Sequence, residues 1–282
     1  MEKIPAQLWR RYLLAVALFG FSNLCAATNC ERIEDSEARD CCERNLPATA
    51  MRQQVQLTVA DDRGTVSNIA AELAWKRFDD GPAKARVNLT EPPRQAGTIV
   101  LLTERPAEPG EAAAEPSVVL FKPSERRDRL ITISALSGEM FGTDFSYEDF
   151  AHFYGTDPAV QVERIGTETW EGRDVVVVQS KPTDPDLAYD RGATYSRIET
   201  RFDVERCVPV STRFFEEDDE LRKELIAHPD EILQHGERWV PHRLVMHDLL
   251  EESRTILVID EIEFDPDIPD RLFSRSSLKR GR

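Results

Sequence analysis

The sequence predicts a mainly β (α+β) fold built on an antiparallel sheet with few helices. From Met51 onward, short runs alternate apolar and polar residues, as strands with one buried face do. Clusters of turn residues separate these runs, and no long helical segments alternate with them. Because parallel strands need long crossover connections, the short connections favour an antiparallel meander over a parallel sheet.

The alternation assigns the expected strands. They cover residues 53–60, 69–78, 83–89, 97–103, 117–121, 130–134, 160–168, 173–181, 194–204, 208–216, 221–228, 232–235, 239–247 and 255–264. Four junctions have the composition of hairpin turns, at 61–64, 171–172, 217–219 and 235–237.

The segment 239–247 indicates strong curvature. On a regular strand, Val240 and Leu244 face one side, while Trp239 and Val245 face the other. Apolar residues on both faces suit a closed or strongly curved sheet with a packed or cavity-lining interior and a covered exterior.

Two helices are expected beside the sheet. The first covers residues 28–44, and Pro47 follows it. The second covers 146–154, where Ser146 and Asp149 have a spacing close to that of a capping box.

Residues 1–27 have the layout of a secretory signal peptide. An apolar run over 12–21 follows Arg10 and Arg11, and small residues precede a cleavage point after Ala27. Ten apolar residues in a helix reach about 15 Å, roughly half of the hydrocarbon core of a bilayer, so the run is too short to span a membrane. We therefore expect an exported protein whose mature part, residues 28–282, is one domain without a transmembrane segment.

The charge balance excludes some partners. The chain has 36 Lys and Arg against 52 Asp and Glu, which gives a formal net charge of -16. Such a protein repels nucleic acid and anionic lipid surfaces. The hydrophobic content of 40% is that of a folded domain rather than of a disordered chain.

Four cysteines remain once the signal peptide is removed: Cys30, Cys41, Cys42 and Cys207, an even number in an oxidising compartment. If 28–44 is one helix, Cys30 and Cys41 lie about 16 Å apart along it, beyond the ~7 Å limit for a bridge. We therefore expect Cys42 or Cys41 to form a disulfide with Cys207. Zinc is a poorer interpretation, because adjacent cysteines without a Cys-x-x-Cys or His pair have a poor ligand spacing.

The most crowded polar stretch, 141–150, contains Asp144, Glu148 and Asp149. Three carboxylates invite an acid–base interpretation, but acidic residues also favour a helix N-terminus, and the aromatic residues around them supply packing. A structural role is therefore expected. No histidine pair has metal-ligand spacing, and the chain has neither a Gly-x-Ser-x-Gly motif nor a glycine-rich phosphate loop. We expect no metal, no cofactor and no enzymatic activity.

The one basic cluster of this acidic chain consists of Arg126, Arg127 and Arg129. Such a run is usually a solvated strand face. A site for a lipid phosphate or an acidic partner is the alternative.

Several segments, taken in order, resemble the periplasmic LolA/LolB-like family of outer-membrane lipoprotein-sorting proteins, in its less characterised branch. The matching stretches are 91–93, 97–102, 121–123, 140–149, 207–209, 221–223 and 268–273, and the most specific is Gly-Thr-Asp-Phe-Ser-Tyr-Glu-Asp at 142–149. The resemblance implies a strongly curved, incomplete antiparallel β-barrel with an N-terminal helix, a plugging helix and an apolar cavity for acyl chains. It also suggests a resistance-nodulation-division (RND) type exporter as a membrane partner.

We therefore expect a periplasmic carrier that shields the acyl chains of a lipid or lipoprotein on the way to the outer membrane. A sixteen-carbon chain in water carries on the order of 12 kcal/mol of unfavourable hydration, so transfer needs a cavity but no catalysis. The candidate cavity residues are Trp75, Phe78, Leu101, Phe121, Phe141, Phe145 and Trp239. Ordinary core packing is the alternative for each.

Two other functions stay open. One is a non-carrying accessory subunit of an RND-type exporter or envelope complex. The other is an envelope hydrolase built on Asp144, Glu148 and Asp149.

Overall fold

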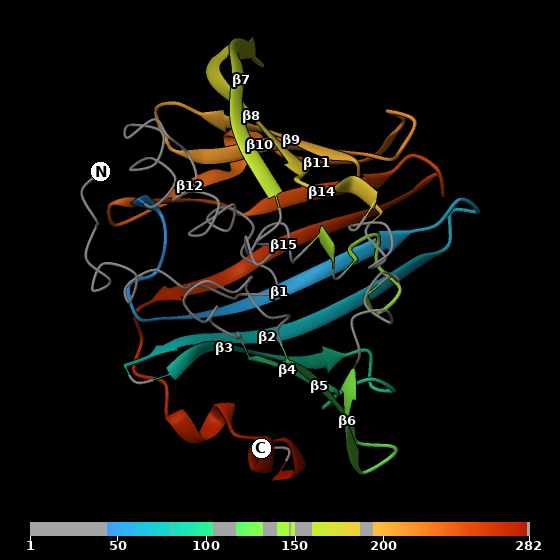
Figure 1. The fold of residues 1–282 in the computed structure, drawn as a ribbon. Coiled ribbons are helices and arrows are strands. Elements are labelled where there is room, and N and C mark those ends of the chain that lie inside the picture. Colours follow the sequence, from blue (N-terminus) through green and yellow to red (C-terminus); the bar gives the residue numbers. More distant parts are fainter. Residues whose placement is uncertain are drawn as a thin grey trace.

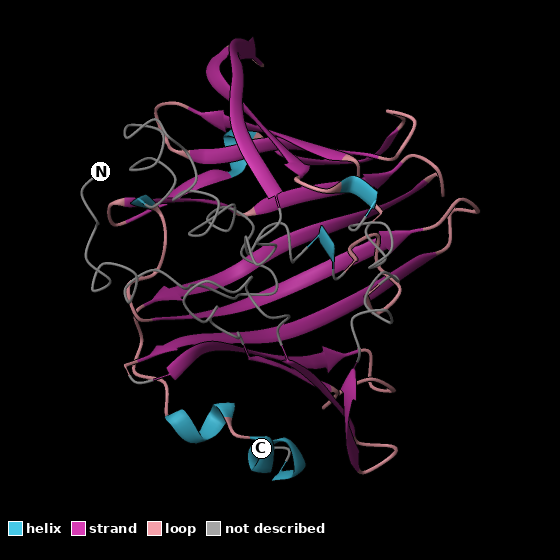
Figure 2. Cartoon of the chain, viewed as in Figure 1, coloured by secondary structure: helices cyan, strands magenta, loops and turns pink. Residues whose placement is uncertain are grey.

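The computed structural model describes residues 44–79, 81–103, 117–131, 140–146, 148–149, 160–186 and 194–280. One large antiparallel sheet dominates this part of the chain (Figure 1, Figure 2). The strands are β1 (Ala50–Ala60), β2 (Val66–Phe78), β3 (Gly81–Glu91), β4 (Ile99–Thr103), β5 (Ser117–Lys122), β6 (Arg127–Ile131), β7 (Val160–Trp170), β8 (Arg173–Pro182), β9 (Arg197–Asp203), β10 (Val208–Phe215), β11 (Leu221–Ala227), β12 (Ile232–His235), β13 (Arg238–Pro241), β14 (Arg243–Asp248) and β15 (Ser253–Phe264).

The first and the last strand lie side by side in the middle of the sheet (Figure 1). From β1 the sheet continues through β2 to β6, and from β15 it continues through β14, β11, β10, β9 and β8 to β7, while β12 and β13 pair separately. Among the described residues, the edge strands β6 and β7 are not paired with each other, so the sheet that they form is not closed into a barrel. The expectation of a mainly β, antiparallel and incompletely closed sheet is confirmed.

β1 shows how the sequence produces a sheet with two different faces. Met51, Val55 and Leu57 are buried in the main apolar cluster, whereas Gln54 is exposed and donates to Glu261 on β15 (2.6 Å). Burying an aliphatic side chain of this size contributes about 1.5–3 kcal/mol, and a slip of one residue would expose the whole set. The alternation therefore fixes which face lies inside.

The four expected hairpin turns all join paired strands: β1 to β2, β7 to β8, β10 to β11, and β12 to β13. In the second of them, Glu171 (φ 47°) and Gly172 (φ 78°) both have positive φ. A type I′ turn requires this at its two central residues, and its twist matches that of the flanking strands.

One expected strand is in fact two, because the segment 239–247 divides at His242 into the end of β13 and most of β14. Pro241 has no N–H to donate to a ladder, and the N–H of His242 donates to the carbonyl of Glu231 (2.8 Å). As a result β13 pairs with β12, while β14 joins the large sheet between β11 and β15.

The helices that lie wholly within the described residues are three short 3-10 helices, η4 (Pro229–Glu231), η5 (Asp270–Phe273) and η6 (Arg275–Arg280). Arg44, Glu148, Asp149 and residues 185–186 are also helical. The expected helices at 28–44 and 146–154 lie outside the described residues, except for Arg44 and for Ser146, Glu148 and Asp149. The apolar run at 12–21 also lies outside them. Within the described ranges, no helix has the length and apolar character needed to cross a membrane.

Candidate functional site

The sheet has two apolar faces. The face that bears the main apolar cluster is called the inner face. This cluster contains residues of strands on both sides of the central β1–β15 pair. The opposite, outer face bears a second cluster where η5 and η6 cover the sheet near β3 to β6 (Figure 1). Any site for an apolar ligand must be assigned to one of these faces.

The structure divides the seven candidate cavity residues among three clusters. On the inner face, Trp75 and Phe145 are fully buried, and Phe141 packs against the same cluster while partly buried. The other members lie elsewhere: Phe78, Leu101 and Phe121 belong to the outer-face cluster, and Trp239 packs in a third one with Val175 and Ile232. Trp75, Leu101, Phe121 and Phe145 are buried, the other three are partly buried, and the seven do not share one cluster.

The segment 140–149 begins with a tight turn that places Phe145 against the inner face. The N–H of Met140 donates to the carbonyl of Phe145 (2.8 Å), and the N–H and hydroxyl of Thr143 both donate to the carbonyl of Met140. Phe141 (φ 58°) and Gly142 (φ 76°) adopt the left-handed region that this turn requires. The turn closes on itself and leaves the Phe145 ring with none of its surface exposed.

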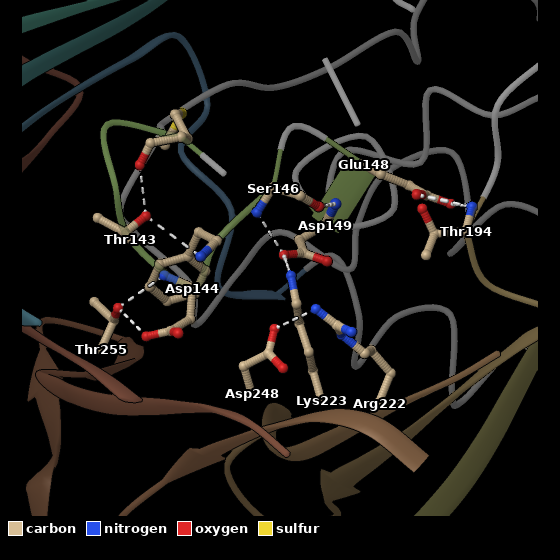
Figure 3. A network of polar contacts seen from close by, with 12 residues as sticks. Thr143, Asp144, Ser146, Glu148, Asp149, Thr194, Arg222, Lys223, Asp248 and Thr255 are labelled. Atoms are coloured by element: carbon tan, nitrogen blue, oxygen red, sulfur yellow. Dashed lines mark hydrogen bonds and ion pairs between the residues drawn. The ribbon is translucent and has the colours of Figure 1, made fainter. Parts of the chain in front are cut away.

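Asp144 fixes this turn to β15 (Figure 3). Its backbone N–H donates to Oγ1 of Thr255 (2.9 Å), and its carboxylate accepts hydrogen bonds from the hydroxyls of Thr255 and Ser253. Asp144 thus makes three hydrogen bonds with β15. Each contributes about 0.5–1.5 kcal/mol, so the turn is firmly attached to this strand.

Asp149 fixes the other end of the segment to β11. The N–H of Ser146 donates to its carboxylate (2.7 Å), and its own N–H donates to Oγ of Ser146 (3.1 Å), so the expected capping-box contact is present. The same carboxylate lies 3.3 Å from Nζ of Lys223 and accepts a hydrogen bond from the hydroxyl of Tyr195 (2.6 Å). Burial and the charge of Asp149 raise the pKa of Tyr195 well above its usual value, so the phenol stays protonated and donates.

Glu148 binds backbone N–H groups. Its carboxylate accepts from the N–H of Thr194 (2.8 Å) and from that of Tyr195 (3.3 Å). Burial raises the pKa of this carboxyl, and these hydrogen bonds oppose the shift only in part. All three carboxylates of the segment are thus engaged in holding the chain together, as Figure 3 shows.

The basic cluster lies on the β5–β6 hairpin. Arg126 and Arg127 are exposed, and Arg129 forms an ion pair with Glu125 (2.5 Å). Asp128, between them, forms an ion pair with Arg275. This arrangement fits a solvated strand face.

Two pairs of residues were not anticipated from the sequence. His235 and His242 are stacked, with ring centroids 4.9 Å apart and their Nε2 atoms 2.7 Å apart. Nδ1 of His242 lies 2.7 Å from the carbonyl oxygen of Ile259, so this nitrogen carries a proton and donates to that oxygen. Burial, together with His242, lowers the pKa of His235. No group of three His, Cys, Asp or Glu residues suited to a metal ion occurs in the described part of the chain.

The second pair is Gln53 and Trp75, whose polar atoms are buried on the inner face. A signal for Gln53 was present in the sequence, because it occupies a position where the alternation of β1 calls for an apolar residue.

Cys207 is disulfide-bonded, and its expected partners Cys42 and Cys41 lie outside the described residues. Nearby, Nδ2 of Asn45 donates to the carbonyl of Cys207 (2.7 Å). The chain just after Cys42 therefore lies beside Cys207.

The fold has clear relatives among solved structures. A domain named as an outer-membrane lipoprotein-sorting protein from Vibrio parahaemolyticus is 18% identical, with a TM-score of 0.72 over 86% of this chain and 97% of that chain. A DUF1329 family protein from Desulfovibrio piger is 16% identical, with a TM-score of 0.75 over 86% and 96%. A LolA superfamily protein from Nitrosomonas europaea is 18% identical, with a TM-score of 0.63 over 86% and 97%.

These likenesses confirm, at the level of the fold, the resemblance that the motifs indicated. No curated protein matches the chain. A family model described as "Uncharacterized protein" matches residues 81–280, which is more than half of the sequence. The chain therefore belongs to that family, and its fold is LolA/LolB-like.

Proposed function

We propose that this protein is a periplasmic carrier that holds the acyl chains of a lipid or lipoprotein against the inner face of its sheet. The observation that carries the proposal is the continuous apolar cluster of that face, which extends over strands on both sides of the β1–β15 pair. The likeness to a domain named as a lipoprotein-sorting protein adds support from the fold.

A carrier also accounts for the polar groups of the site. Each methylene of an acyl chain costs about 0.8 kcal/mol in water, so shielding alone makes transfer possible and no reacting group is required. Asp144, Glu148 and Asp149 are the carboxylates of the segment 140–149, and each already accepts hydrogen bonds from neighbouring chain. Their engagement favours a structural role over hydrolysis.

The segment 140–149 has a positioning role in this proposal. Its attachments to Thr255 on β15 and Lys223 on β11 hold Phe145 against the inner face. An acyl chain on this face would contact Phe145 and Phe141 near one end of the sheet and Trp75 towards the other. Residues on the outer face would not take part.

Quenching of tryptophan fluorescence by a brominated acyl chain tests the proposal. Residues 28–282 contain three tryptophans, Trp75, Trp170 and Trp239. Replacing Trp170 and Trp239 by Phe leaves Trp75 as the only reporter, and a bromine atom quenches only an indole that it approaches closely. We expect saturable quenching of Trp75 by a sixteen-carbon brominated fatty acyl chain.

The matched control is the protein that retains only Trp239, whose ring packs outside the inner-face cluster. We expect no saturable quenching there. If Trp75 is not quenched either, and native mass spectrometry of the periplasmic protein shows no bound lipid, the carrier proposal fails. That result would favour the accessory subunit of an RND-type exporter or envelope complex.

A further inference from the structure

The inner face contains two buried polar atoms without a partner. Nε1 of Trp75 and Oε1 of Gln53 make no hydrogen bond within the described structure. The two residues are 0% and 1% exposed. Neither atom can therefore be satisfied by bulk water.

These atoms belong to one place on the sheet. Trp75 on β2 lies opposite Met51 on β1, and Gln53 is two residues further along β1 on the same face. Diagonal neighbours of this kind have Cβ atoms roughly 7 Å apart, within reach of two long side chains. One unpaired hydrogen-bond donor and one unpaired acceptor thus come from diagonal positions within the apolar cluster of the inner face.

Their burial has an energetic cost. A buried donor or acceptor without a partner costs about 1–3 kcal/mol, and an apolar residue at either position would avoid the penalty. Among the described residues, the hydrogen-bond partner of the Gln53 amide nitrogen is Sδ of Met51, 3.6 Å from Nε2, and a thioether is a weak acceptor. A ligand that supplies both missing partners would recover this energy on binding.

We propose that the carried molecule has an acyl amide that binds here. The carbonyl oxygen of this amide accepts a hydrogen bond from the indole N–H of Trp75, and the N–H of the amide donates to Oε1 of Gln53. An acyl ester supplies only the acceptor and leaves Gln53 unsatisfied. The protein therefore prefers amide-linked over ester-linked acyl chains, whether the amide belongs to a lipid or to an acylated protein; this preference rests on the proposed carrier function.

Two probes that differ in one group test the preference. N-hexadecanoylethanolamine and 2-hydroxyethyl hexadecanoate have the same chain and the same hydroxyl, and differ only in N–H against O. By calorimetry with the mature chain, we expect the amide to bind about tenfold more tightly than the ester, as the gain of one buried hydrogen bond implies.

Variants identify the residues responsible. Gln53→Leu should bring the ratio of the two affinities to about one. Trp75→Phe should lower the affinity for both probes by the same factor and so keep the ratio. Leu57→Met, an apolar exchange further along β1 on the same face, is the control and should change neither quantity. Gln53→Met serves as a second variant if Gln53→Leu does not fold, as judged by thermal denaturation.

The outcomes separate the two proposals. Equal affinity of the wild type for both probes overturns the amide preference and leaves the carrier function standing; a bound water would then satisfy the two atoms. An amide preference that survives in Gln53→Leu also overturns the proposal that the amide binds at Gln53. Binding of neither probe, together with no quenching of Trp75, overturns the carrier function itself.

Discussion

At the scale of single residues, the ion pair between Asp149 and Lys223 is the critical attachment of the segment 140–149. The two groups lie 3.3 Å apart, and their side chains are 0% and 8% exposed. We expect Lys223→Met to lower the free energy of unfolding by about 3–5 kcal/mol, because it leaves a buried carboxylate without its opposite charge. Urea denaturation followed by circular dichroism measures the loss.

An exposed ion pair provides the control for this variant. Arg52 and Glu263 lie 3.3 Å apart, but their side chains are 46% and 63% exposed. Arg52→Met should cost less than about 1 kcal/mol, since solvent screens such pairs. A loss in Lys223→Met no larger than this would show that the buried pair does not hold the segment to the sheet.

Glu148 gives the fold a pH dependence of a defined sign. Burial raises the pKa of its carboxyl, so the folded protein holds this proton more tightly than the unfolded chain does. The stabilisation is complete below the unfolded pKa of about 4.3 and is lost as the pH rises through the raised folded pKa.

We therefore expect the wild type to lose stability relative to Glu148→Gln across this pH range. The glutamine keeps an oxygen that accepts from the N–H groups of Thr194 and Tyr195 but does not titrate. The measurement is the difference between the two unfolding free energies at a series of pH values. A difference that stays constant would contradict the raised pKa.

At the scale of elements, the 3-10 helix η5 should be needed for stability but not for binding. Phe273 is 1% exposed on the outer face, and its ring packs edge-on against Phe78 with centroids 5.7 Å apart. Phe273→Ala should lower the free energy of unfolding by about 3–5 kcal/mol through the cavity that it leaves. Acyl-chain affinity, measured by quenching of Trp75 below the unfolding transition, should stay unchanged.

A parallel loss of affinity in Phe273→Ala would place the ligand on the outer face instead. Leu101 and Phe121, two of the cavity residues expected from the sequence, pack there. This variant therefore also tests whether Leu101 and Phe121, which the structure separates from Trp75, contact the ligand.

The strands were predictable because each one alternates, and the alternation is local information. The break at His242 is masked because the buried positions Val240, Leu244 and Met246 keep one period across it, and Pro241 is the one local signal of two strands. The stacking of His235 on His242 depends on this bend and was missed for the same reason.

The candidate cavity was only partly predictable, because residue type indicates burial but not which face is inner. Leu101 and Leu102 are both buried, yet they belong to opposite faces of β4. The choice between them depends on η5 and η6, which cover the outer face from more than 160 positions away in the chain. Such long-range packing leaves no local pattern in the sequence.

At the scale of the whole molecule, the arrangement of the sheet ties both ends of the described chain together. β1 pairs with β15, and Asn45 reaches both Cys207 and the N–H of Trp239 (2.8 Å). A disulfide from Cys42 or Cys41 to Cys207 would add a covalent tie at the same place. Contacts between residues far apart in sequence therefore hold the strands of the inner face together. Such contacts would keep the shape of this face the same with or without a ligand.

The net charge of the whole chain predicts how it meets membranes. A charge of -16 repels an anionic vesicle over the Debye length, which is about 30 Å at 0.01 M salt and about 8 Å at 0.15 M. We expect transfer of a bound brominated acyl chain to anionic vesicles, followed by recovery of Trp75 fluorescence, to accelerate several-fold over this range. Zwitterionic vesicles are the control and should show little change. A rate that falls as salt is added would instead indicate attraction through the basic cluster Arg126, Arg127 and Arg129, and would make the β5–β6 hairpin the membrane-facing part of the molecule.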